Sequence, residues 1–133
     1  MAGTFKFELI SPEEKLISED VAMVTVPGEE GEFGVLAGHS PLLSSVRAGV
    51  VHIHKSALND NPRRVFVAGG FADVGPDHCT LLAEEAHDLA FVDVHALEAE
   101  IHELSGLAAA VGEHERAAVE KRLGIARAKR AAL

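Results

Sequence analysis

The chain has 133 residues, of which 47% are hydrophobic, and its 21 acidic and 12 basic residues give a formal net charge of −9. This length and hydrophobic content fit one compact domain with a small appendage and exclude a disordered chain. The acidic balance repels phosphate groups, so we expect no nucleic-acid partner. No apolar run approaches the ~20 residues that a membrane-spanning helix needs.

Short β-strands separated by turns are predicted for the first two thirds of the sequence. Residues 4–10 alternate apolar and polar side chains, the period of a strand with one buried face. Turn-forming residues then recur about every eight to twelve positions, as in β-sandwiches and small barrels. The strands that we expect lie at residues 4–10, 21–26, 31–36, 42–46, 49–55, 63–68, 71–74 and 78–82.

Three glycine-, proline- or asparagine-rich segments predict the turns in the middle of the chain. Residues 59–62, Asn-Asp-Asn-Pro, are a strong turn signal, and residues 75–77, Gly-Pro-Asp, are another. Gly69 and Gly70 predict a hairpin between the strands at 63–68 and 71–74, because paired glycines permit the tight primed turns.

From Asp93 onward the pattern becomes helical. The Asp93 side chain suits an N-cap, because its carboxylate can accept hydrogen bonds from N–H groups of the first turn. Apolar residues recur at steps of three and four along 94–111, and residues 113–133 are rich in helix formers and lack proline. The break lies at Ser105 and Gly106 or at Gly112, and we prefer a turn within 106–112.

The predicted fold is therefore an antiparallel β-sandwich over residues 1–86, followed by an antiparallel α-helical hairpin over residues 87–133. Eleven of the residues from 93 to 133 are alanine, which allows close packing but buries little area. We expect the hairpin to lie on the sandwich or on another protein, and to exchange between docked states that differ little in free energy.

The sequence offers few candidates for catalysis or metal binding. His52 and His54 lie on one face of a strand, as in His-x-His zinc ligands, but no third ligand is evident, and exposed strand histidines are the plainer interpretation. His39 lacks the orienting acid and the nucleophile that a general base requires. The acidic cluster at 29–32 is interpreted as a solvated or partner-facing loop. Cys79, the single cysteine, can form no internal disulfide.

Residues 27–43, PGEEGEFGVLAGHSPLL, carry four glycines that predict a chain turning repeatedly at the surface. Together with VAGGF at 67–71 and LAEEA at 82–86, this segment closely resembles the family of epsilon subunits of bacterial F-type ATP synthases, called delta in mitochondria. The resemblance runs from about Phe5 to the C-terminus and is looser in the last third.

The resemblance implies a rotor subunit that joins the gamma subunit to the c-ring in the central stalk, catalyses no reaction and needs no cofactor. It also implies that the glycine-rich loop, with Gly38, Ser40 and Leu42, belongs to the end of the sandwich that meets the c-ring. The full set of residues expected to contact the c-ring or gamma is Glu29, Glu32, Gly38, His39, Ser40, Pro41 and Leu42.

A basic segment follows in the C-terminal helix, with Glu120 as the one acid after position 116. Its members are Arg116, Lys121, Arg122, Arg127, Lys129 and Arg130. They form either a solvated helix face or, as the resemblance implies, a regulatory surface. In the family this helix can rise along the stalk, contact acidic segments of the catalytic alpha and beta subunits, and inhibit ATP hydrolysis.

Some members of the family bind ATP between the two helices through a motif I/L-D-x-x-R-A. Here Asp93 occupies the aspartate position, but Ala96 stands where the arginine is expected. A guanidinium that would bind phosphate is therefore missing, which argues against ATP binding at Asp93 and leaves that alternative open.

The N-terminal residues, MAGTFKFELISPEEK, resemble neither a secretory signal peptide nor an Arg-rich transit peptide. We expect a peripheral protein on the cytoplasmic face of a bacterial inner membrane, held there only indirectly. Two alternatives remain: a small metal-dependent β-fold enzyme using His39, His52 and His54, and a generic adaptor that dimerises through its helical hairpin.

Overall fold

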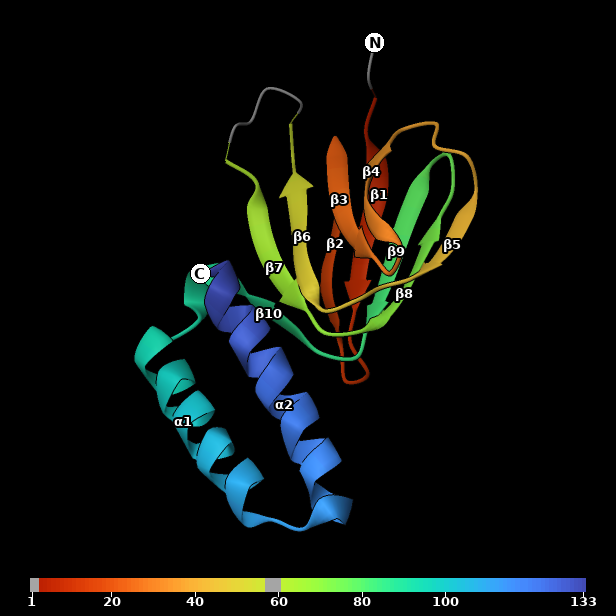
Figure 1. Ribbon diagram of the computed structural model, residues 1–133. Coiled ribbons are helices and arrows are strands. Elements are labelled where there is room, and N and C mark those ends of the chain that lie inside the picture. Colours follow the sequence, from red (N-terminus) through yellow and green to blue (C-terminus); the bar gives the residue numbers. More distant parts are fainter. Residues whose placement is uncertain (1–2, 57–60) are drawn as a thin grey trace. The chain divides into compact units, whose positions relative to one another are not determined.

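The computed structural model describes residues 3–56 and 61–133, and Figure 1 shows strands followed by two helices. The chain divides into two compact units, one ending at Asp88 and the other beginning at Leu89. The predicted class, a β-sandwich followed by a helical hairpin, is confirmed. The turn expected at 59–62 begins at residues that lie outside the described ones.

The first unit contains ten strands among the described residues. They are β1 (Phe5–Ile10), β2 (Lys15–Val21), β3 (Met23–Gly28), β4 (Gly31–Leu36), β5 (Leu42–Ser45), β6 (Gly49–His54), β7 (Arg63–Val67), β8 (Gly70–Val74), β9 (His78–Ala83) and β10 (Ala86–Asp88). Sheet A has the order β2-β1-β9-β8-β5, and sheet B has the order β10-β7-β6-β3-β4. Strands β1 and β9 pair in parallel, and the other neighbours pair antiparallel.

Alternating side chains from both sheets fill the space between the layers. In sheet A, Phe7 and Leu9 of β1 and Leu81 of β9 are fully buried, and Val24 and Val51 lie on the inner face of sheet B. Each fully buried side chain of this size stabilises the folded state by about 1.5–3 kcal/mol. The sandwich therefore has a stabilising hydrophobic core made entirely of its own residues.

Strands β2 and β10 were not predicted. Strand β2 is an edge strand whose sequence, KLISEDV, does not alternate regularly, because few of its side chains reach the core. Strand β10 has three residues and pairs with β7, so the sheet continues to Asp88.

The hairpin predicted at Gly69 and Gly70 is wrong. Strand β7 belongs to sheet B and β8 to sheet A, so the two glycines carry the chain from one layer to the other. Both have positive φ, 79° at Gly69 and 129° at Gly70. A Cβ atom on Gly70 would lie 1.9 Å from the carbonyl oxygen of Leu82, so the crossing requires glycine there.

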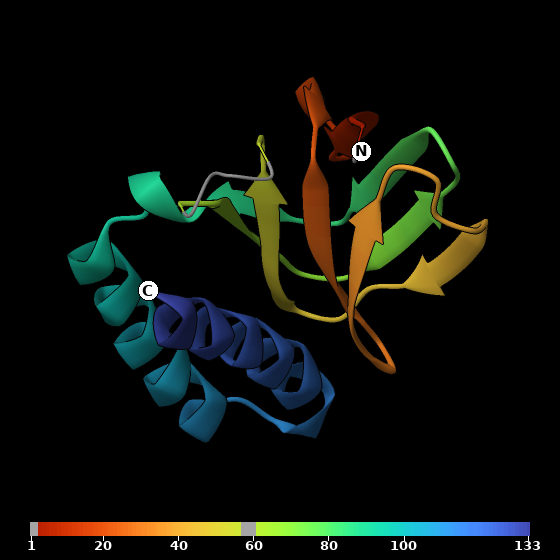
Figure 2. The same ribbon diagram turned by 90° about the horizontal axis from the view of Figure 1, so that it is seen from above.

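The second unit consists of a short 3-10 helix, η1 (Leu89–Phe91), and the helices α1 (Val94–Ala110) and α2 (Glu113–Ala132). Asp93 caps α1 as predicted, with its carboxylate accepting from the N–H groups of His95 and Ala96. The helices separate at Gly112, so the alternative break at Ser105 and Gly106 is wrong, and both residues lie within α1. Figure 2 shows the two helices side by side.

Within residues 3–56 and 61–133, no helix is both long enough and apolar enough to cross a bilayer.

Candidate partner-contact surfaces

The β3–β4 turn carries the first group of expected contact residues. Gly28 and Gly31 form the last pair of the ladder, and Glu29 and Glu30 make the turn between them. The Glu29 N–H donates to the carbonyl oxygen of Ser45 at 2.9 Å, which ties the turn to the end of β5. Glu29, Glu30 and Glu32 are exposed, so this tip presents three carboxylates to solvent.

The second group lies in the loop after β4. Gly38 has a φ of 85°, and its N–H donates to the carbonyl oxygen of Pro76 in the β8–β9 turn. The His39 Nδ1 atom lies 2.6 Å from the carbonyl oxygen of Ser40, as a donor in the tautomer that places the proton there. The loop therefore has a defined backbone path although Ser40 and Pro41 are exposed.

These two groups lie at opposite ends of β4. The strand has six residues, and strands rise about 3.3 Å per residue, so the acidic turn and the Gly38 loop are separated by about 20 Å. The structure therefore does not bring Glu29 and Glu32 together with Gly38, His39, Ser40, Pro41 and Leu42. If all seven residues bind partner subunits, the sandwich binds partners at both of its ends.

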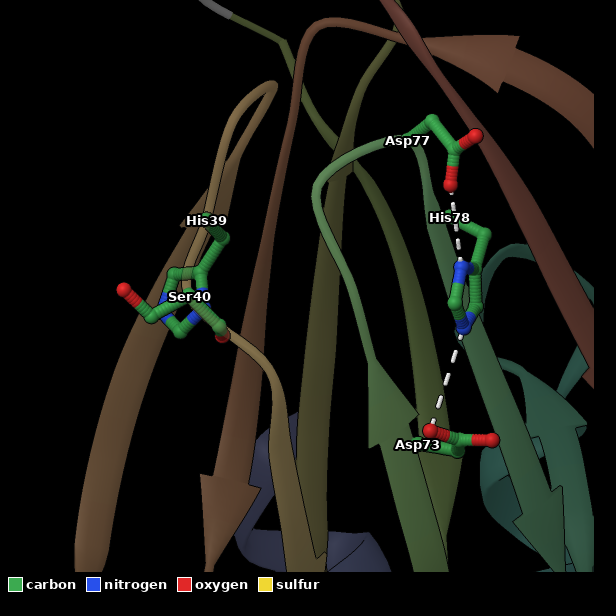
Figure 3. Close-up of polar contacts among 5 residues, drawn as sticks. All are labelled: His39, Ser40, Asp73, Asp77 and His78. Atoms are coloured by element: carbon green, nitrogen blue, oxygen red, sulfur yellow. Dashed lines mark hydrogen bonds and ion pairs between the residues drawn. The ribbon is translucent and has the colours of Figure 1, made fainter.

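A trio of ionisable side chains that the sequence analysis missed lies beside the Gly38 loop. Figure 3 shows the His78 ring between two aspartates, with Nδ1 3.2 Å from Oδ1 of Asp77 and Nε2 3.8 Å from Oδ1 of Asp73. The ring also covers Gly75, where an added Cβ would lie 2.4 Å from its Cε1 atom. In the β8–β9 register Asp73 is opposite Thr80, and His78 lies two residues before Thr80 on the same strand. The side chains of Asp73 and His78 therefore both lie on the outer face of sheet A. A strand-pairing prediction could have found it.

His52 and His54 lie on the partly exposed face of β6, opposite Thr25 and Met23 of β3. Within the described part of the chain, no three His, Cys, Asp or Glu side chains are grouped closely enough to hold a metal ion. The structure thus brings no third ligand to the two histidines.

Burial raises the pKa of the Cys79 thiol to about 12, with Asp73 adding to the shift, so this thiol stays protonated and unreactive.

Several basic side chains of α2 contact α1. Arg130 Nε lies 3.0 Å from Oε1 of Glu98, Arg122 Nη2 lies 3.8 Å from Oε1 of Glu100, and Arg127 Nη2 donates to Ser105 Oγ at 3.3 Å. These residues therefore do not form a purely solvated face, because α1 supplies partners for them. The remaining members differ: Arg116 donates to the carbonyl oxygen of Val111, Lys121 is exposed, and Lys129 is 8% exposed.

Asp93, which occupies the aspartate position of the family's ATP-binding motif, has a structural role here. Asp93 Oδ1 accepts hydrogen bonds from the backbone N–H of His95 at 3.0 Å and of Ala96 at 3.2 Å. Its carboxylate is thus used as the cap of α1, and the exposed Ala96 methyl group provides no donor for a phosphate.

Comparison with known proteins gives consistent matches. Residues 4–88 match the family model described as "ATP synthase, Delta/Epsilon chain, beta-sandwich domain". The chain is 47% identical to the ATP synthase epsilon chain of Rhodospirillum centenum, covering 97% of this chain and 91% of the relative. It is also 47% identical to that of Rhodospirillum rubrum, covering 99% and 98%.

Two solved structures are similar to this chain, one of them over nearly its whole length. A chain in the cryo-EM structure of the Euglena gracilis mitochondrial ATP synthase (OSCP, F1 and c-ring) is similar with a TM-score of 0.82 and 26% identity, covering 97% of this chain and 81% of that one. A chain of the Tetrahymena thermophila central stalk and c-ring shares the fold, with a TM-score of 0.56 and 16% identity over 68% of this chain and 70% of that one.

Proposed function

Because this chain belongs to the delta/epsilon family of ATP synthase subunits, we propose that it is a rotor subunit that links gamma to the c-ring in a proton-translocating ATP synthase. The observation that carries this proposal is the 47% identity to bacterial epsilon chains over nearly the whole chain, hairpin included. The similar Euglena chain belongs to an assembly that contains F1 and the c-ring. Epsilon chains are structural parts of the rotor, not catalytic subunits.

The sandwich is suited to transmit torque. Its core is continuous between the sheets, so a force applied at one end is carried to the other with little deformation. The acidic β3–β4 turn and the Gly38 loop lie at opposite ends, which suits a body held between two neighbours. We assign the end that carries the Gly38 loop to the c-ring and the opposite end to gamma.

The helical unit is suited to regulate ATP hydrolysis. In the closed hairpin Arg122 and Arg130 face carboxylates of α1, and the side chains of both pairs are about half exposed to solvent. Exposed ion pairs contribute about 0–1 kcal/mol each, so acidic segments of the alpha and beta subunits could replace Glu98 and Glu100 at small cost. An opened α2 beside those subunits would block rotation in the hydrolysis direction.

The proposed location follows from the assembly. The c-ring is embedded in the membrane, so this subunit would lie on the cytoplasmic face of a bacterial inner membrane as a peripheral protein. It would reach the membrane only through its partners.

Truncation of the chain after residue 90 tests this assignment. The buried core cluster lies entirely before Leu89, so we expect the sandwich to assemble with the complex and keep proton pumping coupled to ATP hydrolysis. ATPase activity should rise several-fold because the blocking helix is gone. ATPase rates and ATP-driven proton uptake in inverted vesicles measure the two effects. Loss of coupling with an unchanged ATPase rate would contradict the proposal.

Cross-linking tests the two-ended arrangement. A cysteine at Ser40 and one at Glu30 place a reactive thiol at each end, while native Cys79 is buried and does not compete. We expect the two positions to cross-link to different subunits of the assembled complex. Cross-linking of both to the same subunit would refute this part of the proposal.

A further inference from the structure

The Gly38 loop is joined to the β8–β9 turn, residues 75–77. The Gly38 N–H donates to the carbonyl oxygen of Pro76 at 2.6 Å. Directly after the loop, β5 pairs with the end of β8, where Leu42 is opposite Val74. Because the loop is joined to this hairpin at both points, the conformation of the β8–β9 turn sets where the loop lies.

The turn is held by contacts of its own. The Gly75 N–H donates to the carbonyl oxygen of His78 at 2.9 Å. The Lys6 N–H donates to the carbonyl oxygen of Asp77 at 3.1 Å, which joins the turn to β1. The His78 ring lies so close to Gly75 that an added Cβ atom would overlap it. Figure 3 shows the same ring between Asp77 and Asp73, so the ring also joins the turn to β8.

His78 can hold both aspartates only as an imidazolium. A neutral imidazole has one N–H donor and one nitrogen with a lone pair, whereas the imidazolium has two donors. Here Nδ1 lies 3.2 Å from a carboxylate oxygen of Asp77, and Nε2 lies 3.8 Å from one of Asp73. In the neutral ring one of these carboxylates faces a lone pair and its contact becomes unfavourable. Loss of a proton therefore weakens the attachment of the ring to the turn.

Neighbouring strands add two acids and two bases to this face of sheet A. Lys6 lies beside His78 in the parallel β1–β9 pair, and Asp20 of β2 is opposite Lys6. Glu8 also belongs to this face, and Lys15 pairs with it at 2.6 Å. The charges of these four side chains balance, so the two aspartates that contact the ring distinguish its charged form from its neutral form.

His39 is an ionisable residue within the loop itself, but its contact does not depend on charge. Its Nδ1 atom lies 2.6 Å from the carbonyl oxygen of Ser40. A ring that is protonated at Nδ1 donates to this oxygen whether it is neutral or cationic. The part of this end that responds to protonation is therefore His78.

We propose that His78 is a positioning residue for the contact with the c-ring. As an imidazolium held by both aspartates it fixes the β8–β9 turn, and the turn fixes the Gly38 loop. This inference rests on the function proposed above, which assigns the loop to the c-ring. The loop is held most firmly in mildly acidic solution and loosens as the pH rises across about 5–8, the interval in which histidine changes charge.

Solvent exchange of the Gly38 amide tests the inference on the full-length chain. Its rate, measured by NMR and divided by the intrinsic rate at each pH, reports the hydrogen bond to Pro76. Protection should fall about two- to fivefold between about pH 5.5 and 7.5, a small change because exposed ion pairs are weak. The amide of Val46, which donates to Gly70 at the start of β8, should show no such change.

Two variants separate positioning by charge from simple packing. His78→Leu keeps an apolar side chain but has no donor, so protection of Gly38 should be about two- to fivefold lower at acidic pH and constant as the pH rises. Asp73→Asn offers an amide that accepts from the imidazolium and donates to the neutral ring, so protection should stay high throughout.

His87→Leu is the matched control. His87 is 40% exposed and lies 2.7 Å from a carboxylate oxygen of Glu85, whereas His78 is 42% exposed. It belongs to β10 at the edge of sheet B, so its variant should keep the wild-type pH profile. A profile that persists in His78→Leu or in Asp73→Asn would overturn the inference, as would a wild-type Gly38 amide whose protection does not change with pH.

Photo-cross-linking on the assembled complex extends the test to the c-ring. A photoreactive maleimide is attached to Ser40→Cys, and native Cys79 is buried and does not compete. Irradiation should capture a c subunit with a yield that falls as the pH rises, and the yield should become constant when Asp73→Asn is added.

The two measurements distinguish the inference from the proposed function. If Gly38 protection behaves as expected but no c subunit is captured at any pH, the proposed contact with the c-ring is refuted. If a c subunit is captured but neither Gly38 protection nor the capture yield depends on pH and on His78, only the positioning role is refuted.

Discussion

The two units of this chain bury very different amounts of apolar surface. The sandwich core joins side chains from both sheets, many of them fully buried. In the described residues from Leu89 onward, the buried hydrophobic side chains are Leu89, Leu97, Leu123 and Ala126. The comparison teaches that one chain can combine a well-packed body with a helical segment that buries few apolar side chains, and the proposed function of a rotor subunit with a regulatory arm requires both.

The largest expected effect comes from removing one buried leucine in each unit. Leu81→Ala should lower the free energy of unfolding of the sandwich by about 2–5 kcal/mol, because it leaves a cavity in a closely packed core. Leu123→Ala should leave the sandwich transition unchanged within about 0.5 kcal/mol while speeding amide exchange along α1 and α2. Urea denaturation and hydrogen exchange measure the two. One shared transition that shifts equally in both variants would break the comparison.

A matched pair of glycine variants sharpens the comparison between the sandwich and the helical unit. Gly70→Ala should destabilise the sandwich by about 1–3 kcal/mol or more, because Gly70 has a φ of 129° and its Cβ would overlap the Leu82 carbonyl oxygen. Gly106→Ala should stabilise α1 by about 0.5–1 kcal/mol, because Gly106 is in mid-helix with no heavy atom within 4 Å of the added methyl group. Thermal unfolding of the two variants should therefore shift in opposite directions, and a stabilising Gly70→Ala would be inconsistent with the crossing described here.

Gly70 also illustrates how far the sequence could predict the fold. Alternation in β1 and the helical period after Asp93 are local patterns, and both led to correct elements. A glycine pair has the same conformational freedom whether the chain reverses within a sheet or crosses between sheets, so the sequence could not decide between them. Strand β2 was missed for a related reason: an edge strand buries few side chains and shows little periodicity.

The surfaces were less predictable than the elements. The Glu29 turn and the Gly38 loop are neighbours in sequence, yet β4 separates them. Conversely, Ile10, Phe71 and Leu82 are far apart in sequence and become neighbours only through the register of three strands. Local patterns carry no information on such pairings, so the apolar row that these residues form on sheet A could be found only from the coordinates.

The smallest expected effect concerns the ion pair between the helices. Arg130→Glu breaks the contact with Glu98, and the double variant Arg130→Glu with Glu98→Arg restores it with reversed charges. Both side chains are about half exposed, so the pair should contribute only about 0–1 kcal/mol to the closed hairpin.

Amide exchange in α1 and α2 measures the closed state directly. We expect faster exchange in Arg130→Glu, recovery in the double variant, and a smaller difference at high salt, where the interaction is screened. In the assembled enzyme the two variants should separate, because the double variant restores the closed hairpin but still lacks a cation at position 130 for the catalytic subunits. ATPase inhibition that recovers fully in the double variant would show that the pair sets only the hairpin equilibrium and that Arg130 does not contact those subunits.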